Sequence, residues 1–182
     1  PNTKLIVICN PNNPTGALTA LLDIAQLAST NPETIILIDE AYAEFSGVTA
    51  ISLIEQYPNI IVTRTFSKAF GLASVRMGYI VANSTYIQEL KKIMGPYDLN
   101  SAGVTAVRAA LADTSYVTSY VQEVMQQAKP LVALFFQRNG IQYYPSQANF
   151  ILFKPDQAES VAKRLEQAGY RLRPQRHPSI AD

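Results

Sequence analysis

Four short apolar runs in the first half of the chain constrain its fold more than any other feature. They cover residues 5–9, 35–38, 60–63 and 79–82. The first, Leu5–Cys9, is rich in β-branched residues and is typical of a strand buried on both faces. Helical patterns or long crossovers separate the runs, and parallel strands need such connections. The sequence therefore predicts an α/β fold around a mostly parallel sheet with flanking helices.

Helical patterns fill the gaps between these runs and dominate after Ser84. In the first half they lie at 19–29, where Thr19 is the expected N-cap, and at 51–56. Later helices are expected at 85–94, 101–112 and 115–139. They are followed by strands at 142–144 and 150–153, a helix at 155–168 with Gly169 at its end, and a strand at 170–173. These elements predict a small C-terminal α+β module after one long helix.

Charge and composition exclude several classes of function. The chain has 15 basic and 14 acidic side chains, spread along its 182 residues, which is not the pattern of a nucleic-acid-binding or membrane-flanking surface. No apolar run approaches the ~20 residues that span a bilayer. Cys9 and His177 are the single cysteine and the single histidine. They allow neither a disulfide framework nor a histidine-based metal site, and they favour a cytoplasmic location.

Polar residues gather where the predicted strands end. Asn13 follows the first strand, Asp39 and Tyr42 follow the second, residues 65–68 follow the third, and Arg76 precedes the fourth. In open α/β sheets the ligand crevice lies outside the carboxyl ends of the strands. Taken singly, each residue also has an ordinary structural interpretation, such as a turn residue for Asp39 or a surface ion-pair partner for Arg76. Their order along the chain is what indicates a site.

Six short segments stand in a specific order along the chain. They are Asn10-Pro11-Asn12-Asn13-Pro14-Thr15-Gly16, Asp39-Glu40-Ala41-Tyr42, Thr65-Phe66-Ser67-Lys68-Ala69-Phe70-Gly71, Arg76-Met77-Gly78-Tyr79, Tyr97-Asp98-Leu99-Asn100 and Asn149-Phe150. Together they resemble the fold-type I pyridoxal-5′-phosphate (PLP) aminotransferases, and within that superfamily they are most similar to the histidinol-phosphate aminotransferases. One such motif alone has many false matches, whereas four in order are specific. Ala73-Ser74-Val75 departs mildly, since the family often has Gly and Leu there.

The resemblance implies a PLP site centred on Lys68. In the family such a lysine binds the cofactor aldehyde covalently and then moves the α-proton of the substrate. Asp39 would pair with the pyridine nitrogen and keep it protonated, so that the ring acts as an electron sink. Tyr42 and Asn13 would donate hydrogen bonds to the phenolate oxygen of the ring. The peptide bond between Asn13 and Pro14 would be cis.

The same resemblance implies a phosphate subsite and a substrate contact. Thr65, Ser67 and Arg76 would hold the cofactor phosphate, with Arg76 providing paired, charge-assisted hydrogen bonds. Eight residues separate Lys68 from Arg76 (76 − 68 = 8), which allows a loop to fold around that group. Arg173 matches a family position that contacts the substrate, although a solvated charge at a strand end is an equally good interpretation.

The implied function is transamination in a homodimer. The amino group would pass from histidinol phosphate to 2-oxoglutarate, a step of histidine biosynthesis. The first alternative is another fold-type I PLP enzyme, either a different aminotransferase or an amino-acid phosphate decarboxylase, because these enzymes share a cofactor site. The second alternative is an inactive fragment that acts, if at all, by association.

The resemblance also implies a division into domains. Residues 1–112 would form part of the PLP-binding large domain, and 113–182 the long connecting helix with part of a small C-terminal domain. The family has a further phosphate-binding segment before this region and a substrate-binding arginine after it. We therefore expect the chain, which begins at Pro1 rather than at Met, to be a piece of a longer protein. By itself it would bind PLP poorly.

Overall fold

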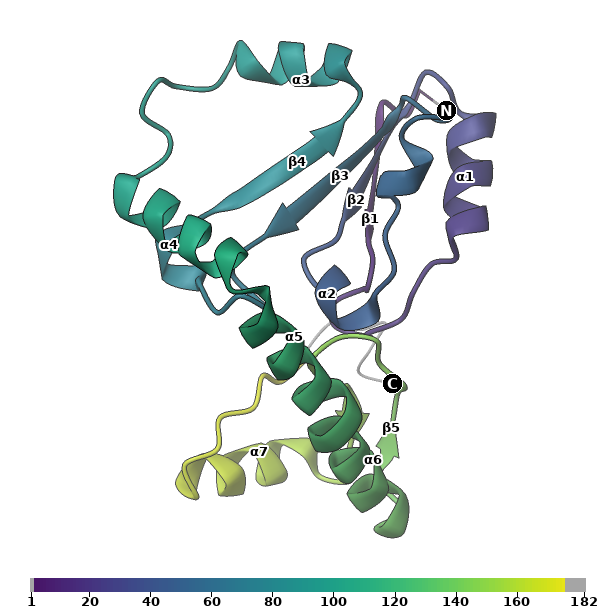
Figure 1. Cartoon of the computed structure of the whole chain (residues 1–182). Helices are drawn as coiled ribbons and strands as arrows, with labels where there is room; N and C mark the ends of the chain where they lie inside the picture. The colour runs from purple at the N-terminus through teal and green to yellow at the C-terminus, as the bar shows by residue number, and fades with distance from the viewer. Residues whose placement is uncertain (1, 176–182) are drawn as a thin grey trace.

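Four strands form the central sheet, in the order β1-β2-β3-β4 (Figure 1). The structure is a computed structural model that describes residues 2–175, so that His177 lies outside the described residues. The strands are β1 Leu5–Cys9, β2 Ile35–Asp39, β3 Ile60–Thr65 and β4 Gly78–Ala82. β1, β2 and β3 run parallel, and β4 is antiparallel to β3. The prediction of an α/β fold with a mostly parallel sheet is confirmed.

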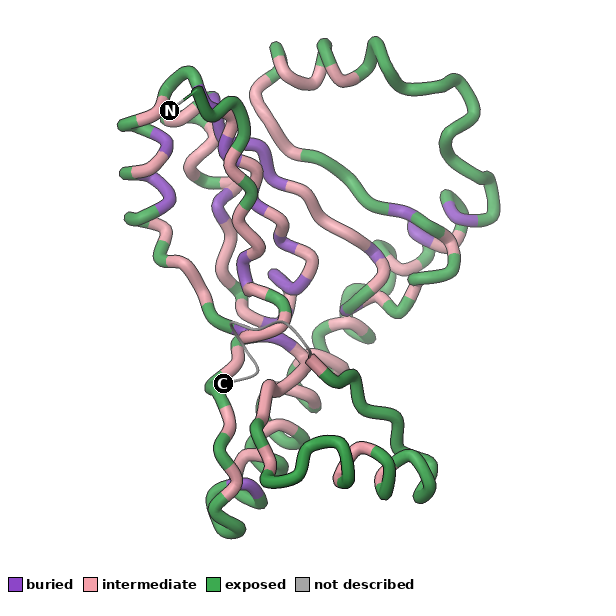
Figure 2. Tube along the Cα trace, turned by 180° about the vertical axis from the view of Figure 1, so that it is seen from behind, coloured by how far each residue is buried: buried purple, intermediate pink, exposed green. Residues whose placement is uncertain are grey.

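One face of the sheet carries the main core. Helix α1 (Leu21–Thr30) packs on it, together with the chain that follows Ala50. The buried members of this core are Ile24, Ala28, Ile36, Ile38, Ala50, Ile60 and Val62. Figure 2 shows the buried residues concentrated along these strands and on the inner side of α1. Alternate residues of β2 contribute to the core, as the period of two in a strand requires.

The opposite face of the sheet is only partly covered, and at β1 it is open. Leu5 and Val7 are 50% and 56% exposed, whereas Ile6 and Ile8 pack against the core. The prediction that Leu5–Cys9 is buried on both faces is therefore wrong for this chain. Successive side chains of a strand point to opposite faces, and no helix of the described residues covers Leu5 and Val7.

The helices differ from the predicted ones mainly at their ends. α1 begins at Leu21, with Ala20 at the N-cap position, so Thr19 does not cap the helix. The Thr19 N–H donates instead to Asn10 Oδ1 (2.8 Å). A three-residue 3-10 turn, η1, replaces the helix predicted at 51–56. The other elements of this half are α2 Ala43–Ser46, η1 Ile51–Leu53, η2 Ala73–Val75, α3 Ser84–Lys91 and α4 Ser101–Ala112. Within the described residues no helix is both long and apolar enough to cross a bilayer.

The long helix predicted at 115–139 is present as three consecutive segments. They are α5 Thr114–Glu123, the π-helical turn η3 Val124–Ala128, and α6 Lys129–Arg138. Pro130 explains the wide turn, because it has no N–H to donate and its ring collides with the carbonyl four residues earlier in a regular α-helix. The widened turn keeps the chain helical, and the Lys129 N–H donates to the Val124 carbonyl across it.

The C-terminal module combines α6 with a two-stranded sheet and one further helix. β5 (Gln142–Tyr143) and β6 (Phe153–Lys154) pair antiparallel, and α7 spans Ala158–Gln167. Phe136 of α6 stacks on Phe153 with ring centroids 4.7 Å apart. This aromatic contact fixes the sheet against the helix.

The strand predicted at 170–173 is wrong. The Tyr170 N–H donates to the Leu165 carbonyl (2.8 Å), and Gly169 has a φ of 87°. This pattern is the Schellman closure of a helix, with glycine in the left-handed region. The backbone after α7 therefore ends the helix and does not pair with β5 or β6.

Candidate active site

The carboxyl ends of β1, β2 and β3 lie at one end of the sheet, and the predicted site residues follow them (Figure 1). Backbone hydrogen bonds hold these three ends in register. The Asn10 N–H donates to the Asp39 carbonyl (2.8 Å), and the Glu40 N–H donates to the Thr63 carbonyl (2.9 Å). The sheet thus extends by one residue beyond β1 and β2, which gives the loops a rigid base.

Asn13, Tyr42 and Lys68 come together although 55 residues separate the first from the last (68 − 13 = 55). Asn13 Nδ2 donates to the Tyr42 hydroxyl (3.1 Å). Lys68 Nζ lies over the Tyr42 ring, 5.2 Å from its centroid and within the range of a cation–π contact. Tyr42 is buried and Lys68 is exposed, so that the amine remains accessible. The cis bond predicted between Asn13 and Pro14 is confirmed.

Asp39 is the last residue of β2 and is half-buried. Its Oδ1 accepts a hydrogen bond from the Ala41 N–H (3.1 Å). Cys9 is its partner across the β1–β2 pairing. Burial, and then the charge of Asp39, raise the pKa of the Cys9 thiol, so that Cys9 stays protonated and unreactive near neutral pH.

The β3–β4 hairpin places Arg76 close to the end of β3. Thr65 pairs with Gly78 across the hairpin, and Thr65 Oγ1 accepts a hydrogen bond from the Ser67 N–H (3.0 Å). Arg76 is exposed, has a φ of 57°, and donates to the Ala73 carbonyl (3.0 Å). Thr65 and Ser67 thus share one turn after β3, and the described contact of the Arg76 guanidinium is with the Ala73 carbonyl.

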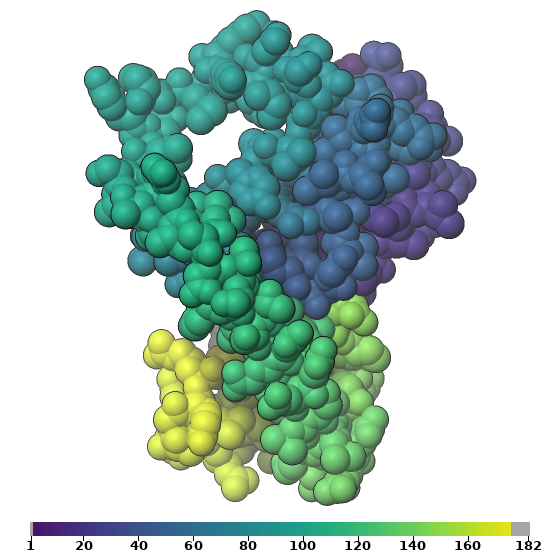
Figure 3. All heavy atoms as spheres, in the orientation of Figure 1, coloured from purple at the N-terminus to yellow at the C-terminus, as the bar shows by residue number. Residues whose placement is uncertain are grey.

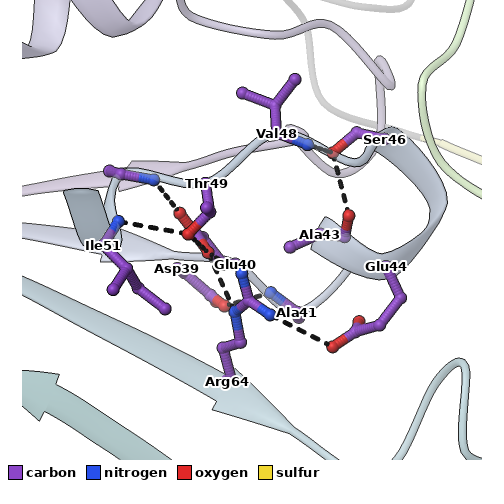
Figure 4. A network of polar contacts seen from close by, with 11 residues as sticks. Asp39, Glu40, Ala41, Ala43, Glu44, Ser46, Val48, Thr49, Ile51 and Arg64 are labelled. Atoms are coloured by element: carbon purple, nitrogen blue, oxygen red, sulfur yellow. Dashed lines mark hydrogen bonds and ion pairs between the residues drawn. The ribbon is translucent and has the colours of Figure 1, made fainter. Parts of the chain in front are cut away.

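Glu40 and Arg64 form the centre of an ionic network that was not predicted from the sequence (Figure 4). Glu40 is fully buried and accepts hydrogen bonds from Arg64 Nε (3.0 Å) and Nη2 (2.8 Å). It also accepts from Thr49 Oγ1 (2.8 Å) and the Ala50 N–H (2.5 Å). In the sequence, Glu40 follows Asp39 and Arg64 precedes Thr65, each at the end of an apolar strand. These two opposite charges were the signal that could have indicated the network.

Glu44 contributes a weaker second contact to Arg64. The Arg64 Nη1 to Glu44 Oε1 distance is 3.7 Å, and Glu44 Oε2 is buried without a hydrogen-bond partner. Burial raises the pKa of Glu44, an effect that a backbone hydrogen bond and the Arg64 charge only partly offset. Glu40 is therefore the carboxylate that determines the position of Arg64.

A segment that follows β5 packs against the site, and in Figure 1 it rises from β5 toward α2. The Gln147 N–H donates to the Gly16 carbonyl (2.8 Å). Ala148 is fully buried in one cluster with Tyr42, and the Phe150 ring meets the Tyr42 ring edge-on with centroids 5.1 Å apart. The sequence motif Asn149-Phe150 thus contributes a ring that contacts Tyr42, a role that the motif alone did not indicate.

Gly16→Ala is expected to destabilise the protein by roughly 2–5 kcal/mol. Gly16 has a φ of 74°, which costs an L residue ~1–2 kcal/mol. A Cβ there would also lie 2.8 Å from Ser146 Cα, so that backbone must shift at an overpacking cost of ~1–3 kcal/mol. Urea denaturation measures the difference. Gly47→Ala is the matched control, because Gly47 has a φ of 68° with nothing within 4 Å. Equal losses in the two variants would contradict the close approach of Ser146.

Arg173 is not brought to the other predicted site residues. It lies exposed in the irregular segment after α7. The structure describes no hydrogen bond or ion pair between Arg173 and Asn13, Tyr42 or Lys68. Its role in substrate binding stays a prediction. Within residues 2–175 there is also no group of three or more His, Cys, Asp or Glu side chains suited to a metal ion.

Comparison with known proteins decides the family. The family model described as aminotransferase class I and II matches residues 1–181. The chain belongs to the class I and II aminotransferases. Histidinol-phosphate aminotransferase from Lactiplantibacillus plantarum is 43% identical over 178 residues, which cover 95% of this chain and 50% of the relative. Dihydroxyacetone phosphate transaminase from Campylobacter jejuni is 39% identical over 178 residues, 96% of this chain and 48% of the relative.

Solved structures agree with this aminotransferase assignment. Histidinol-phosphate aminotransferase from Sinorhizobium meliloti, solved in complex with pyridoxal-5′-phosphate, superposes with a TM-score of 0.89 at 28% identity. The match covers 99% of this chain and 51% of that one. The chain thus spans about half the length of the relatives it matches. The resemblance to fold-type I aminotransferases that its motifs indicated is confirmed.

Proposed function

We propose that the protein is a PLP-dependent aminotransferase whose cofactor is bound by Lys68. The proposal is carried by one arrangement: the exposed Lys68 amine lies 5.2 Å from the ring centroid of Tyr42, whose hydroxyl is held by Asn13. PLP has an aldehyde, a phenolate oxygen, a pyridine nitrogen and a phosphate. The strand ends carry an amine, hydroxyl and amide donors, a carboxylate and a guanidinium, so that the residues fit the cofactor chemically.

Four residues would bind the ring and do the proton chemistry. Lys68 Nζ would hold the cofactor at its aldehyde carbon, with the aldehyde oxygen lost as water, and the Asp39 carboxylate would accept the pyridine N–H. The Tyr42 hydroxyl accepts from Asn13 and keeps its own proton, which it can donate to the phenolate oxygen. When bound, PLP supplies an electron sink that acidifies the α-C–H of the substrate amine. Lys68 Nζ, once released, would take this proton and return it to the accepting carbon.

Three residues would bind the phosphate. The Ser67 hydroxyl can donate one hydrogen bond. The Thr65 hydroxyl, in the same turn, donates to the Met77 carbonyl (3.4 Å) and would turn from it to reach the phosphate. Arg76 uses one donor on the Ala73 carbonyl and retains the others of its guanidinium. A guanidinium matches the geometry of a phosphate better than an ammonium does.

The proposed substrates are histidinol phosphate and 2-oxoglutarate, in histidine biosynthesis. The relative from L. plantarum, at 43% identity, supports this choice. The dihydroxyacetone phosphate transaminase at 39% identity supports a different phosphorylated substrate as the second candidate. Both names include a phosphate ester, for which the cationic Arg173 is the candidate contact. Histidinol phosphate is an amine and would donate its amino group to 2-oxoglutarate, whereas dihydroxyacetone phosphate is a ketone and would accept one. Assays of the two reactions decide between the candidates.

We also propose that the protein forms a homodimer and that it is located in the cytoplasm. The segment between α3 and α4 stands away from the sheet (Figure 3). It exposes large apolar side chains, with Ile93 83%, Tyr97 93% and Leu99 56% exposed. Contiguous exposed apolar surface of this kind marks protein contacts, and the family's dimers favour a second copy. The lone Cys9 requires no oxidising compartment.

Cofactor trapping tests the proposal. The protein is incubated with PLP and reduced with borohydride, and the modified lysine is mapped by mass spectrometry. We expect the adduct to form selectively on Lys68, with the six other lysines largely unmodified. Adducts spread over exposed lysines would contradict the proposed site. The same trap on a chain extended to the relatives' length shows whether further residues are needed for affinity.

A further inference from the structure

Lys129 is a half-buried cation that the proposed chemistry does not use. It is the first residue of α6, directly after the π turn. Its Nζ donates to the carbonyls of Ser146 (2.5 Å) and Ala148 (2.6 Å) and lies 3.5 Å from Met125 Sδ. No carboxylate of the described residues forms an ion pair with it. Burial lowers the pKa of Lys129, because it removes water from the charged amine. The dipoles of the two carbonyls stabilise this charge in the place of a carboxylate.

The segment that Lys129 binds is the one that packs against the candidate site. Between the two carbonyls, the Gln147 N–H donates to the Gly16 carbonyl (2.8 Å), in the same loop as Asn13. Ala148 is fully buried in the cluster that contains Tyr42. Lys129 is thus connected, through residues 146–148, to the loop that contains Asn13 and to Tyr42, over whose ring Lys68 lies.

We propose that Lys129 is a positioning residue for the cofactor site. By binding the two carbonyls after β5, it holds the loop of Asn13 and the ring of Tyr42 in the orientation that the cofactor requires. The inference rests on the proposed function. Lys129 is not among the residues proposed to hold the cofactor, and it acts through Asn13 and Tyr42.

This role has a spectroscopic consequence. Hydrogen bonds from Tyr42 and Asn13 to the phenolate oxygen favour the deprotonated form of the bound cofactor. If Lys129 is removed, these donors lose their fixed position and the proton affinity of the bound cofactor rises. The pH midpoint of its visible absorption band then moves upward. A side chain that only stabilised the fold would leave this midpoint unchanged.

The experiment compares Lys129→Met, Lys129→Gln and Lys129→Arg with Lys92→Met as control. Lys92 is an exposed lysine that pairs with Glu89 on α3. Hydrogen exchange is measured without cofactor, and the pH midpoint of the absorption band is measured after addition of PLP. We expect Lys129→Met to accelerate exchange at Gln147 and in residues 12–17 by about tenfold or more, with β1, β2 and β3 protected as before. Its pH midpoint is expected to rise.

The arginine variant separates positioning from packing. Lys129→Arg keeps a cation for the two carbonyls and is expected to restore both readouts largely, whereas Lys92→Met changes neither. Unchanged exchange and midpoint in Lys129→Met, or an arginine variant as altered as the methionine one, overturns the proposal. If the methionine variant does not fold, Lys129→Gln gives the same two readouts. Failure of wild-type trapping at Lys68 instead rejects the proposed function, while exchange still tests the connection to Gly16.

Discussion

A Lys68→Ala variant of the protein extended to the relatives' full length is expected to retain its fold while its rate of transamination falls by at least ~10³-fold. The side chain is exposed, and its described contact is the Tyr42 ring, worth about 0.5–1 kcal/mol at such a site. Chemistry, by contrast, depends on this amine twice, since it attaches the cofactor and carries the proton. The expected result is therefore a large loss of activity at nearly unchanged stability. Activity with an amine and 2-oxoglutarate, measured beside urea denaturation, checks both parts.

Lys91→Ala is the matched control for this experiment. Lys91 is an exposed lysine in α3, at a distance in sequence from every predicted site residue. Its removal should change neither activity nor the borohydride adduct. Full transamination in the Lys68 variant would reject Lys68 as the cofactor lysine. A Lys68 variant that unfolds would show that the side chain has a structural role that its exposure does not suggest.

A Glu40→Ala variant is expected to lose about 3–5 kcal/mol of folding free energy. The Glu40 side chain is fully buried, and it binds Arg64, whose side chain is only 17% exposed. Removal of the carboxylate leaves a cation with no comparable partner, because Glu44 lies at 3.7 Å. The Ala50 N–H and the Thr49 hydroxyl also lose their acceptor. Since a domain has only ~5–15 kcal/mol of stability, this loss is expected to lower the temperature of half-unfolding.

Urea denaturation at neutral pH measures this effect, with Glu55→Ala as the exposed control. A double variant, Glu40→Leu with Arg64→Leu, separates the unpaired charge from the lost carboxylate. Apolar replacement of both partners is often nearly neutral, so the double variant should recover part of the loss. Recovery remains partial because Ala50 and Thr49 stay without an acceptor. A single variant as stable as the control would contradict the assignment of Glu40 to a buried, essential pair.

Much of the fold could be predicted from local patterns. β1, β2 and β3 begin and end within two residues of the expected positions, because β-branched runs between turn residues have few alternatives. The errors have local physical causes. Pro130 widens one turn of the long helix, and the amide of Tyr170 closes α7 in place of pairing in a strand.

For the candidate site, the ordered motifs predicted Asn13, Asp39, Tyr42, Lys68 and Arg76. All but Arg76 lie at or after the carboxyl ends of β1, β2 and β3, and parallel strands bring these ends to one side of a sheet. Asn13 and Tyr42 indeed form a hydrogen bond across 29 residues of sequence. The order of the motifs and the topology of the strands are therefore enough to predict which residues lie together at this end of the sheet.

The contacts of Glu40, Gly16 and Lys129 depended on the tertiary structure. In the sequence, Glu40 is one more polar residue after a strand, and only the structure shows that it binds Arg64. Gly16 reads as an ordinary turn glycine until Ser146 occupies the space of its missing Cβ. Lys129 reads as a solvated charge on a helix until two carbonyls from a distant segment surround it. Burial and long-range hydrogen bonds arise only when segments far apart in the chain pack together, and no local pattern encodes which segments will meet.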